Sequence, residues 1–229
     1  MDHLLRTSLV IGKEAIAKLS QCRVIICGLG GVGGYATEAL ARSGLGFLTL
    51  IDGDVVEETN LNRQLIATLS TIGKEKTKVM AERVKEVSPT TKVSTYNVFL
   101  SADNLFEYIC NTDYVIDCID DIGAKTALIV YCLKNNIPLI SSMGAGGRVD
   151  PTLIQIADIS ETTIDPLART MRRRLREHGI SQGLKVVYSQ EKPVKAQKVD
   201  GEMVIGSTAF VPPAFGLALA SFVIRDLIS

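Results

Sequence analysis

Glycines, cations and a carboxylate follow one another along the chain at spacings that suit phosphoryl chemistry. The glycines form a Gly-x-Gly-x-x-Gly loop after an apolar run, and they are Gly28, Gly30, Gly31 and Gly33. Glycine lets the backbone turn sharply and approach a phosphate, while free N–H groups at the start of the next helix attract the anion. Arg63, Lys76 and Asp120 then supply positive charge and a carboxylate suited to Mg²⁺.

The loop and the acid that follows it fit two nucleotides equally well. Asp52 comes 19 residues after Gly33, close to the spacing of about 20 expected for a ribose-binding acid in a dinucleotide fold. Arg63 and Lys76 favour ATP over NAD, because fixed cations stabilise the charge of a triphosphate that expels pyrophosphate. Lys76 falls in the first turn of a predicted helix, whose dipole also attracts anions.

Three acids lie within or directly after the apolar strand at 114–119, and they are Asp117, Asp120 and Asp121. Asp120 stands at the carboxyl end of this strand, where doubly wound sheets bind their ligands, and it is predicted to hold Mg²⁺. Asp117 is interpreted as a structural acid or as a second metal ligand. Asp121 fits a helix cap for the segment after it.

Helical and strand-like patterns alternate along the chain and predict an α/β fold, with a Rossmann-like, mostly parallel, doubly wound sheet. The expected helices are 13–19, 32–42, 75–87, 102–110, 123–135 and 166–177. The expected strands are 23–27, 47–51, 92–98, 114–119, 137–141, 153–157, 185–189 and 202–206. Residues 1–143 are predicted to bind ATP, and 144–229 to form a smaller substrate-binding and dimerisation portion of the same globular unit. The run at 144–147 either allows close substrate approach or forms a tight turn.

Composition predicts a cytoplasmic enzyme without a membrane span. The chain has 229 residues, of which 46% are hydrophobic and 22% charged, enough for one α/β domain with a full core. Its five cysteines lack paired spacing, which indicates reduced thiols. Charged residues within the first 19 positions argue against a signal peptide. The apolar run at 214–224 is shorter than the roughly 20 residues of a span, so it predicts a helix in the core or a dimer interface.

These residues, together with the run Asn60-Leu61-Asn62-Arg63-Gln64, resemble the ubiquitin-activating-enzyme-like (ThiF) superfamily over most of the chain. The resemblance implies that Asp52 binds the ribose hydroxyls and Asp120 the Mg²⁺ of ATP. It implies that the phosphates are bound by Asn60, Arg63 and Lys76.

An N-terminal arginine extends the resemblance. Arg6 stands six residues before Gly12 and is similar to the superfamily's arginine that reaches the phosphates of the neighbouring subunit. A homodimer is therefore implied, with Arg6 joining Arg63 and Lys76 as catalytic residues.

The positions of the cysteines indicate which branch of the superfamily the chain resembles. The cysteines are Cys22, Cys27, Cys110, Cys118 and Cys132. They include no Cys-x-x-Cys pair of the kind that binds zinc in sulfur-carrier adenylyltransferases, and none after Cys132 that could form a thioester. The segments 138–140, 144–152, 154–155 and 165–168 resemble the branch that dehydrates threonylcarbamoyladenosine in tRNA. That branch uses ATP to form an acyl adenylate, which cyclises with loss of AMP; an accessory sulfur-relay protein is left open as a partner.

Two other functions stay open: an adenylyltransferase for a ubiquitin-like sulfur carrier, and a non-catalytic nucleotide-binding scaffold. A tRNA partner is favoured by the basic segment 169–198, which holds nine basic residues against two acidic ones and is a candidate footprint for a phosphate backbone. Four of its arginines cover several faces of one predicted helix, so not all can face one partner. A solvated helix surface is the equally weighted alternative.

Overall fold

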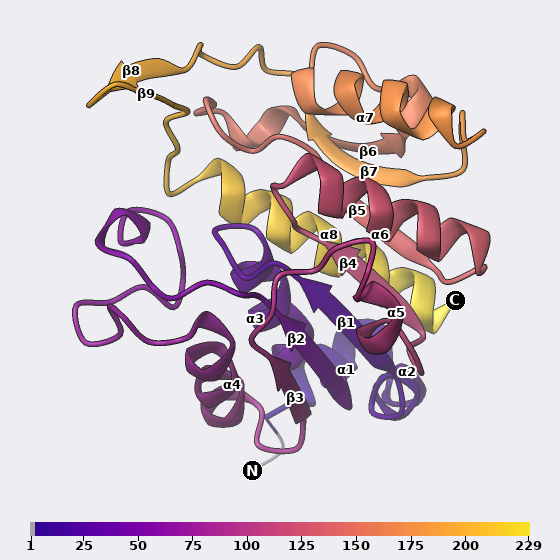
Figure 1. Ribbon diagram of the computed structural model, residues 1–229. Coiled ribbons are helices and arrows are strands. Elements are labelled where there is room, and N and C mark those ends of the chain that lie inside the picture. The colour runs from indigo at the N-terminus through magenta and orange to yellow at the C-terminus, as the bar shows by residue number, and fades with distance from the viewer. Residues whose placement is uncertain (1–2) are drawn as a thin grey trace.

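The apolar runs form one mostly parallel sheet with helices on both faces (Figure 1). The computed structural model describes residues 3–229. Met1 and Asp2, the first two residues of the segment that was predicted not to be a signal peptide, lie outside the described residues. The elements are α1 (Leu5–Ile11), α2 (Lys13–Leu19), β1 (Arg23–Cys27), α3 (Gly33–Arg42), β2 (Phe47–Ile51), η1 (Glu58–Asn60), α4 (Lys76–Val87), β3 (Lys92–Tyr96), α5 (Leu105–Tyr108), β4 (Tyr114–Asp117), α6 (Ile122–Lys134), β5 (Leu139–Ser142), η2 (Pro151–Leu153), β6 (Ile154–Asp158), η3 (Ile159–Glu161), α7 (Pro166–Glu177), β7 (Lys185–Ser189), β8 (Gln197–Val199), β9 (Glu202–Val204) and α8 (Val211–Ile228).

The strand order places a ligand site at the middle of the sheet. The seven strands run β3-β2-β1-β4-β5-β7-β6, and all neighbours are parallel except β6 and β7. The chain first builds outward from β1 through β2 to β3, then returns to lay β4 on the other side of β1. Such a reversal opens a crevice beyond the carboxyl ends of β1 and β4. The predicted doubly wound α/β fold is confirmed.

Alternating residues of the strands serve two apolar cores. In β1, Val24 and Ile26 pack with residues of α3, α4 and α8, whereas Ile25 and Cys27 pack with residues of α5, α6 and α7. A strand that is buried on both faces reads as a continuous apolar run, which is why β1 is recognisable in the sequence. The sheet also continues across Gly144, because β5 pairs with β7.

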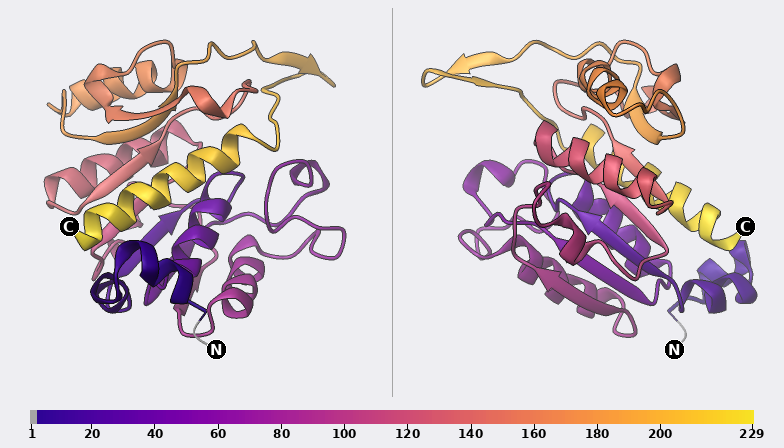
Figure 2. Two further views of the ribbon diagram at one scale, coloured as in Figure 1. Left: turned by 180° about the vertical axis from the view of Figure 1, so that it is seen from behind. Right: turned by 45° about the vertical axis from the view of Figure 1, so that its right-hand side comes forward.

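Several predicted elements have different ends. The helix expected at 102–110 is shorter and forms only α5. Before α5, the Asn104 side chain accepts a hydrogen bond from the Ser101 amide and donates to the Phe99 carbonyl, which holds residues 99–104 in a turn. The strand expected at 114–119 ends at Asp117, where the chain turns into the crevice. The strand expected at 202–206 is β9, which pairs with β8 in a hairpin that extends from the body (Figure 2).

The C-terminal helix α8 is a core helix. It contacts α3 closely, since a Cβ atom on Gly216 would lie 2.3 Å from the Val32 carbonyl oxygen. Within the described residues it is the one helix long and apolar enough to cross a membrane, but half of it is buried inside the fold. Pro212 and Pro213 stand in its first turn, where their missing N–H groups cost nothing. The predicted buried helix at 214–224 is confirmed and extends three residues earlier and four later.

Candidate active site

Backbone crowding explains the glycines between β1 and α3. Gly28 has φ +90°, and a Cβ atom there would lie 2.7 Å from the Cys118 carbonyl oxygen. A Cβ atom on Gly33 would lie 1.8 Å from the Gly28 carbonyl oxygen. Gly28, Gly30 and Gly31 line a cavity, whereas Gly33 does not and instead lets α3 start directly against the loop. The first three are therefore exposed to the cavity, and the fourth shapes the turn.

The cavity has a volume of about 910 Å³ and occupies the predicted crevice. Besides the three glycines, the predicted site residues that line it are Asp52, Arg63, Lys76 and Asp120. They come from the ends of β2 and β4, the loop after η1 and the start of α4. The fold thus brings together residues that are up to 92 positions apart in the sequence.

Asp52 is held rigidly at the end of β2. One carboxylate oxygen accepts from the Leu29 amide at 2.6 Å and the other from the Asp54 amide at 2.8 Å. Burial raises the pKa of Asp52, while the Lys76 ammonium and these two amides oppose that rise. Each oxygen keeps a further lone pair, so a fixed carboxylate faces the cavity and can accept hydrogen bonds from hydroxyl groups.

Lys76 places a nearly buried cation at the first position of α4. Its ammonium lies 2.7 Å from Oδ2 of Asp54, and its side chain is 6% exposed against 50% for Asp54. An ammonium has three donors, so two remain for an anion in the cavity. The start of α4 adds the positive end of its dipole.

Arg63 and Gln64 enter the cavity from the turn after η1. The Arg63 Nη1 donates to the Thr59 carbonyl at 2.9 Å and to the Asn62 side chain at 2.8 Å, which fixes the guanidinium. Gln64 is buried, and its Oε1 has no hydrogen-bond partner among the described residues. Gln64 was not predicted to have a role, and its position at the end of the run 60–64 is the one feature of the sequence that indicates it.

The structure does not bring Asn60 to the cavity. Its Oδ1 accepts from the Glu57 amide at 3.1 Å and closes the capping box of η1. The side chain is therefore used to shape the turn that carries Arg63. Arg6 also lies outside the cavity lining, exposed on α1.

The three acids near the end of β4 have three different surroundings. Asp117 is fully buried, and its Oδ2 accepts from the Lys125 ammonium at 2.7 Å and from the Ser141 hydroxyl at 2.6 Å. The Asp121 carboxylate caps α6 through the Ala124 amide at 2.7 Å. Asp120 lines the cavity and makes no hydrogen bond to any described residue, so its carboxylate is available to a cation. Asp117 is thus a structural acid and Asp121 a helix cap.

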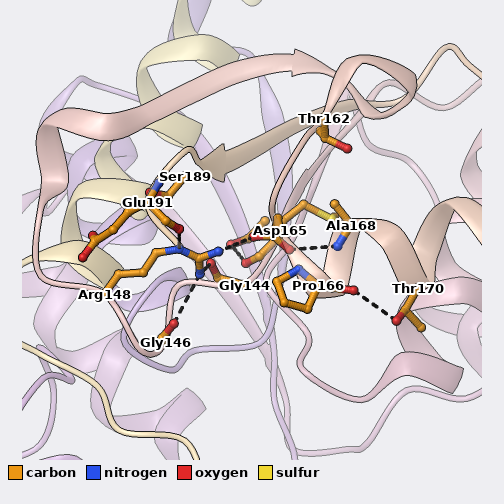
Figure 3. Close-up of polar contacts among 12 residues, drawn as sticks. Gly144, Gly146, Arg148, Thr162, Asp165, Pro166, Ala168, Thr170, Ser189 and Glu191 are labelled. Carbon is orange, nitrogen blue, oxygen red and sulfur yellow. Dashed lines mark hydrogen bonds and ion pairs between the residues drawn. The ribbon is translucent and has the colours of Figure 1, made fainter. Parts of the chain in front are cut away.

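A buried arginine fixes the opposite wall of the cavity (Figure 3). The Arg148 guanidinium donates to the carbonyl oxygens of Gly144 and Gly146, to that of Glu191 at 3.0 Å, and to Asp165 at 2.8 Å. The side chains of Arg148 and Asp165 are 1% and 0% exposed. Gly144 and Gly146 line the cavity, so Arg148 sets the position of this wall. Arg148 was not predicted as a site residue, because nothing in the sequence around it distinguishes it from a surface arginine.

One thiol, that of Cys118, lines the cavity in surroundings that disfavour its ionised form. Burial and then the nearby Asp117 charge raise the pKa of Cys118 far above its ordinary value. The reactive form of cysteine is the thiolate. Cys118 therefore stays protonated at neutral pH.

Comparison with known proteins settles the family. Residues 2–227 match the ThiF family. The chain belongs to the ThiF family. The predicted resemblance is thus confirmed, and the glycine loop, Asp52 and Lys76 stand within the matched region.

Relatives within the ThiF family match almost end to end. A tRNA threonylcarbamoyladenosine dehydratase of Bacillus subtilis is 42% identical over 97% of this chain and 93% of the relative. The crystal structure of the Escherichia coli enzyme of that name in complex with ATP has a TM-score of 0.91 and 38% identity, and covers 97% of this chain and 92% of its own. A second crystal structure of it, in complex with AMP, has a TM-score of 0.92.

Proposed function

We propose that the protein is an ATP-dependent tRNA threonylcarbamoyladenosine dehydratase. The observation that carries this proposal is the 42% identity to a dehydratase over 97% of the chain, with no large segment of either protein left unmatched. The cavity supports it, because a ribose-binding carboxylate, a phosphate-binding loop and two cations converge there. Crystal structures of a similar dehydratase in complex with ATP and with AMP support the binding of this nucleotide.

The residues of the cavity suit an adenylation reaction. The carboxylate of the threonyl group attacks the α-phosphate of ATP, and pyrophosphate leaves. Lys76 and Arg63 stabilise the charge on the phosphates during this step, and Asp52 holds the ribose. Loss of AMP then closes the ring; this second step is intramolecular, so proximity supplies much of its rate. No protein nucleophile is needed, which agrees with the protonated Cys118.

Asp120 fits a Mg²⁺ ion that also binds ATP. Among the described residues, no three His, Cys, Asp or Glu side chains converge on one point. Mg²⁺ commonly uses one or two carboxylates together with substrate phosphates and water, so the single free carboxylate of Asp120 is sufficient. When bound, the ion would neutralise phosphate charge.

The active form is proposed to be a homodimer. Arg6 lies on α1, where Leu9 and Val10 are 78% and 84% exposed. Leu4, at the start of α1, packs against Gly44 in the turn before β2, at the sheet edge opposite the cavity. Because Arg6 is not part of the lining of its own cavity, we assign it to the cavity of a second subunit. Mixing Arg6→Ala with Lys76→Ala protein should form heterodimers with one intact site; heterodimers without activity would contradict this role.

Pyrophosphate release tests the proposed function directly. The protein would be incubated with ATP and one of three substrates: tRNA carrying threonylcarbamoyladenosine, the same tRNA without the modification, or a ubiquitin-like carrier ending in Gly-Gly. We expect release only with the modified tRNA, together with a tRNA product lighter by one water. Release with the carrier alone would favour the adenylyltransferase alternative.

A further inference from the structure

Helix α7 has one buried side and one arginine-rich side. Ala168, Met171 and Leu175 are buried in the core shared with α6. Three exposed arginines stand at i, i+4 and i+7, which places them along one face of a helix with 3.6 residues per turn. We call them the α7 stripe: Arg169, Arg173 and Arg176.

The other two arginines of α7 are already engaged. The Arg172 Nη1 donates to the Thr162 carbonyl at 3.0 Å and also to the Thr162 hydroxyl, so this side chain ties α7 to η3. Arg174 forms an ion pair with Glu177 at 3.7 Å. By contrast, no side-chain hydrogen bond or ion pair joins the three arginines of the stripe to any described residue. Three positive charges are therefore left for a partner.

The stripe starts beside the active site. Leu167 lines the cavity, two residues before Arg169. Asp165 accepts from the Ala168 amide at 2.9 Å and from Arg148, so the start of α7 is fixed to the same wall of the cavity (Figure 3). From Arg169 to Arg176 the helix advances about 10 Å. Two residues turn an α-helix by about 200°, so Arg169 faces away from Leu167, and a chain whose reacting group sits in the cavity passes over the start of α7 to reach the three guanidinium groups.

We propose that the α7 stripe binds the phosphate backbone of the tRNA substrate next to the modified nucleoside. The inference rests on the proposed function and adds the surface that holds the RNA. Guanidinium groups bind phosphate bidentately, and the regular spacing on one helix face gives three contacts along a backbone. Arg172 is excluded from this surface although it lies within the same basic run.

Salt-dependent tRNA binding tests the stripe. Each phosphate contact contributes about 0.7 to 0.9 to the slope of log K against log salt. In the stripe variant all three arginines become Gln, so we expect the slope to fall by about 2 to 3. When the salt is raised from 50 to 200 mM, the Kd of both proteins should increase. The factor of increase should be roughly twenty- to fortyfold smaller for the stripe variant than for the unchanged protein. KM for modified tRNA should rise, with kcat and ATP affinity unchanged.

A control variant removes equal charge at the opposite edge of the sheet. Lys78, Lys85 and Lys92, on α4 and β3, are exposed, and changing all three to Gln should leave the slope and KM unchanged. An equal loss in both variants would overturn the proposal, as would an unchanged slope in the stripe variant. If the triple stripe variant does not fold, Arg173→Gln alone should lower the slope by about 1. Absence of turnover in the unchanged protein would instead refute the proposed function, because binding is measured separately.

Discussion

The two walls of the cavity use charge in opposite ways. On the wall formed by β2, β4 and α4, the charged groups face the cavity: Lys76 has a half-exposed partner, and Asp120 has none among the described residues. On the wall at Gly144, the charges of Arg148 and Asp165 are buried against each other, and residues 142–146, which line the cavity, carry no charged side chain. Charge on the first wall is therefore available to a ligand, whereas charge on the second maintains structure.

The largest effect is expected from removing Arg148, which tests whether the charges of the second wall maintain structure. In Arg148→Ala, Asp165 would remain buried without its cation, and losing one partner of such a pair costs about 3–5 kcal/mol. The free energy of unfolding, measured in urea, should fall by that amount. Arg174→Ala is the control, because its exposed ion pair should contribute only about 0–1 kcal/mol. Equal losses in the two variants would show that the buried pair has no special structural role.

Removing Lys76 should affect activity and leave stability nearly unchanged. Its partner Asp54 is half-exposed and stays solvated in Lys76→Ala. Loss of one preorganised donor to developing charge lowers kcat by about 10²–10³. Lys78→Ala is a matched control on the same helix, since that ammonium pairs with Glu75 at the surface. We expect a large fall in pyrophosphate release only for Lys76→Ala, with both melting temperatures close to that of the unchanged protein. A wild-type rate would remove Lys76 from the site.

The same contrast explains which residues were predictable. The glycine loop and Asp52 are separated by short, regular stretches, and each follows an apolar strand, so their spacing indicated the site. Arg148 contacts Asp165 and Glu191, which are 17 and 43 residues away, and no local pattern encodes such contacts. Asn60 shows the opposite case, a predicted site residue whose side chain has a structural contact. It stands in the predicted run, but its short side chain turns back to the Glu57 amide, and this choice depends on local geometry that the motif does not record.

Helices are likewise predictable from the sequence only where local residues determine their ends. The predicted helix 166–177 is correct to the residue, because Asp165 caps it and Pro166 fits its first position. Helix α1 was not expected, since its seven residues bury no side chain within this subunit and leave Leu9 and Val10 exposed. A helix without a fully buried side chain gives little amphipathic signal in the sequence.

Asp120 and Asp121 allow the finest test of charge on the first wall. They are adjacent and both line the cavity, yet only Asp121 has a described structural contact, the cap of α6. Asp121→Asn keeps the cap, because Asn and Asp cap helices about equally well, and should leave the rate unchanged. Asp120→Asn removes an anionic ligand and should raise the Mg²⁺ concentration for half-maximal pyrophosphate release at least about tenfold. Excess Mg²⁺ should restore part of the rate only in Asp120→Asn. Identical Mg²⁺ titrations of the two variants would mean that the phosphates alone hold the metal. Asp120 would then be a solvated carboxylate without a role in metal binding.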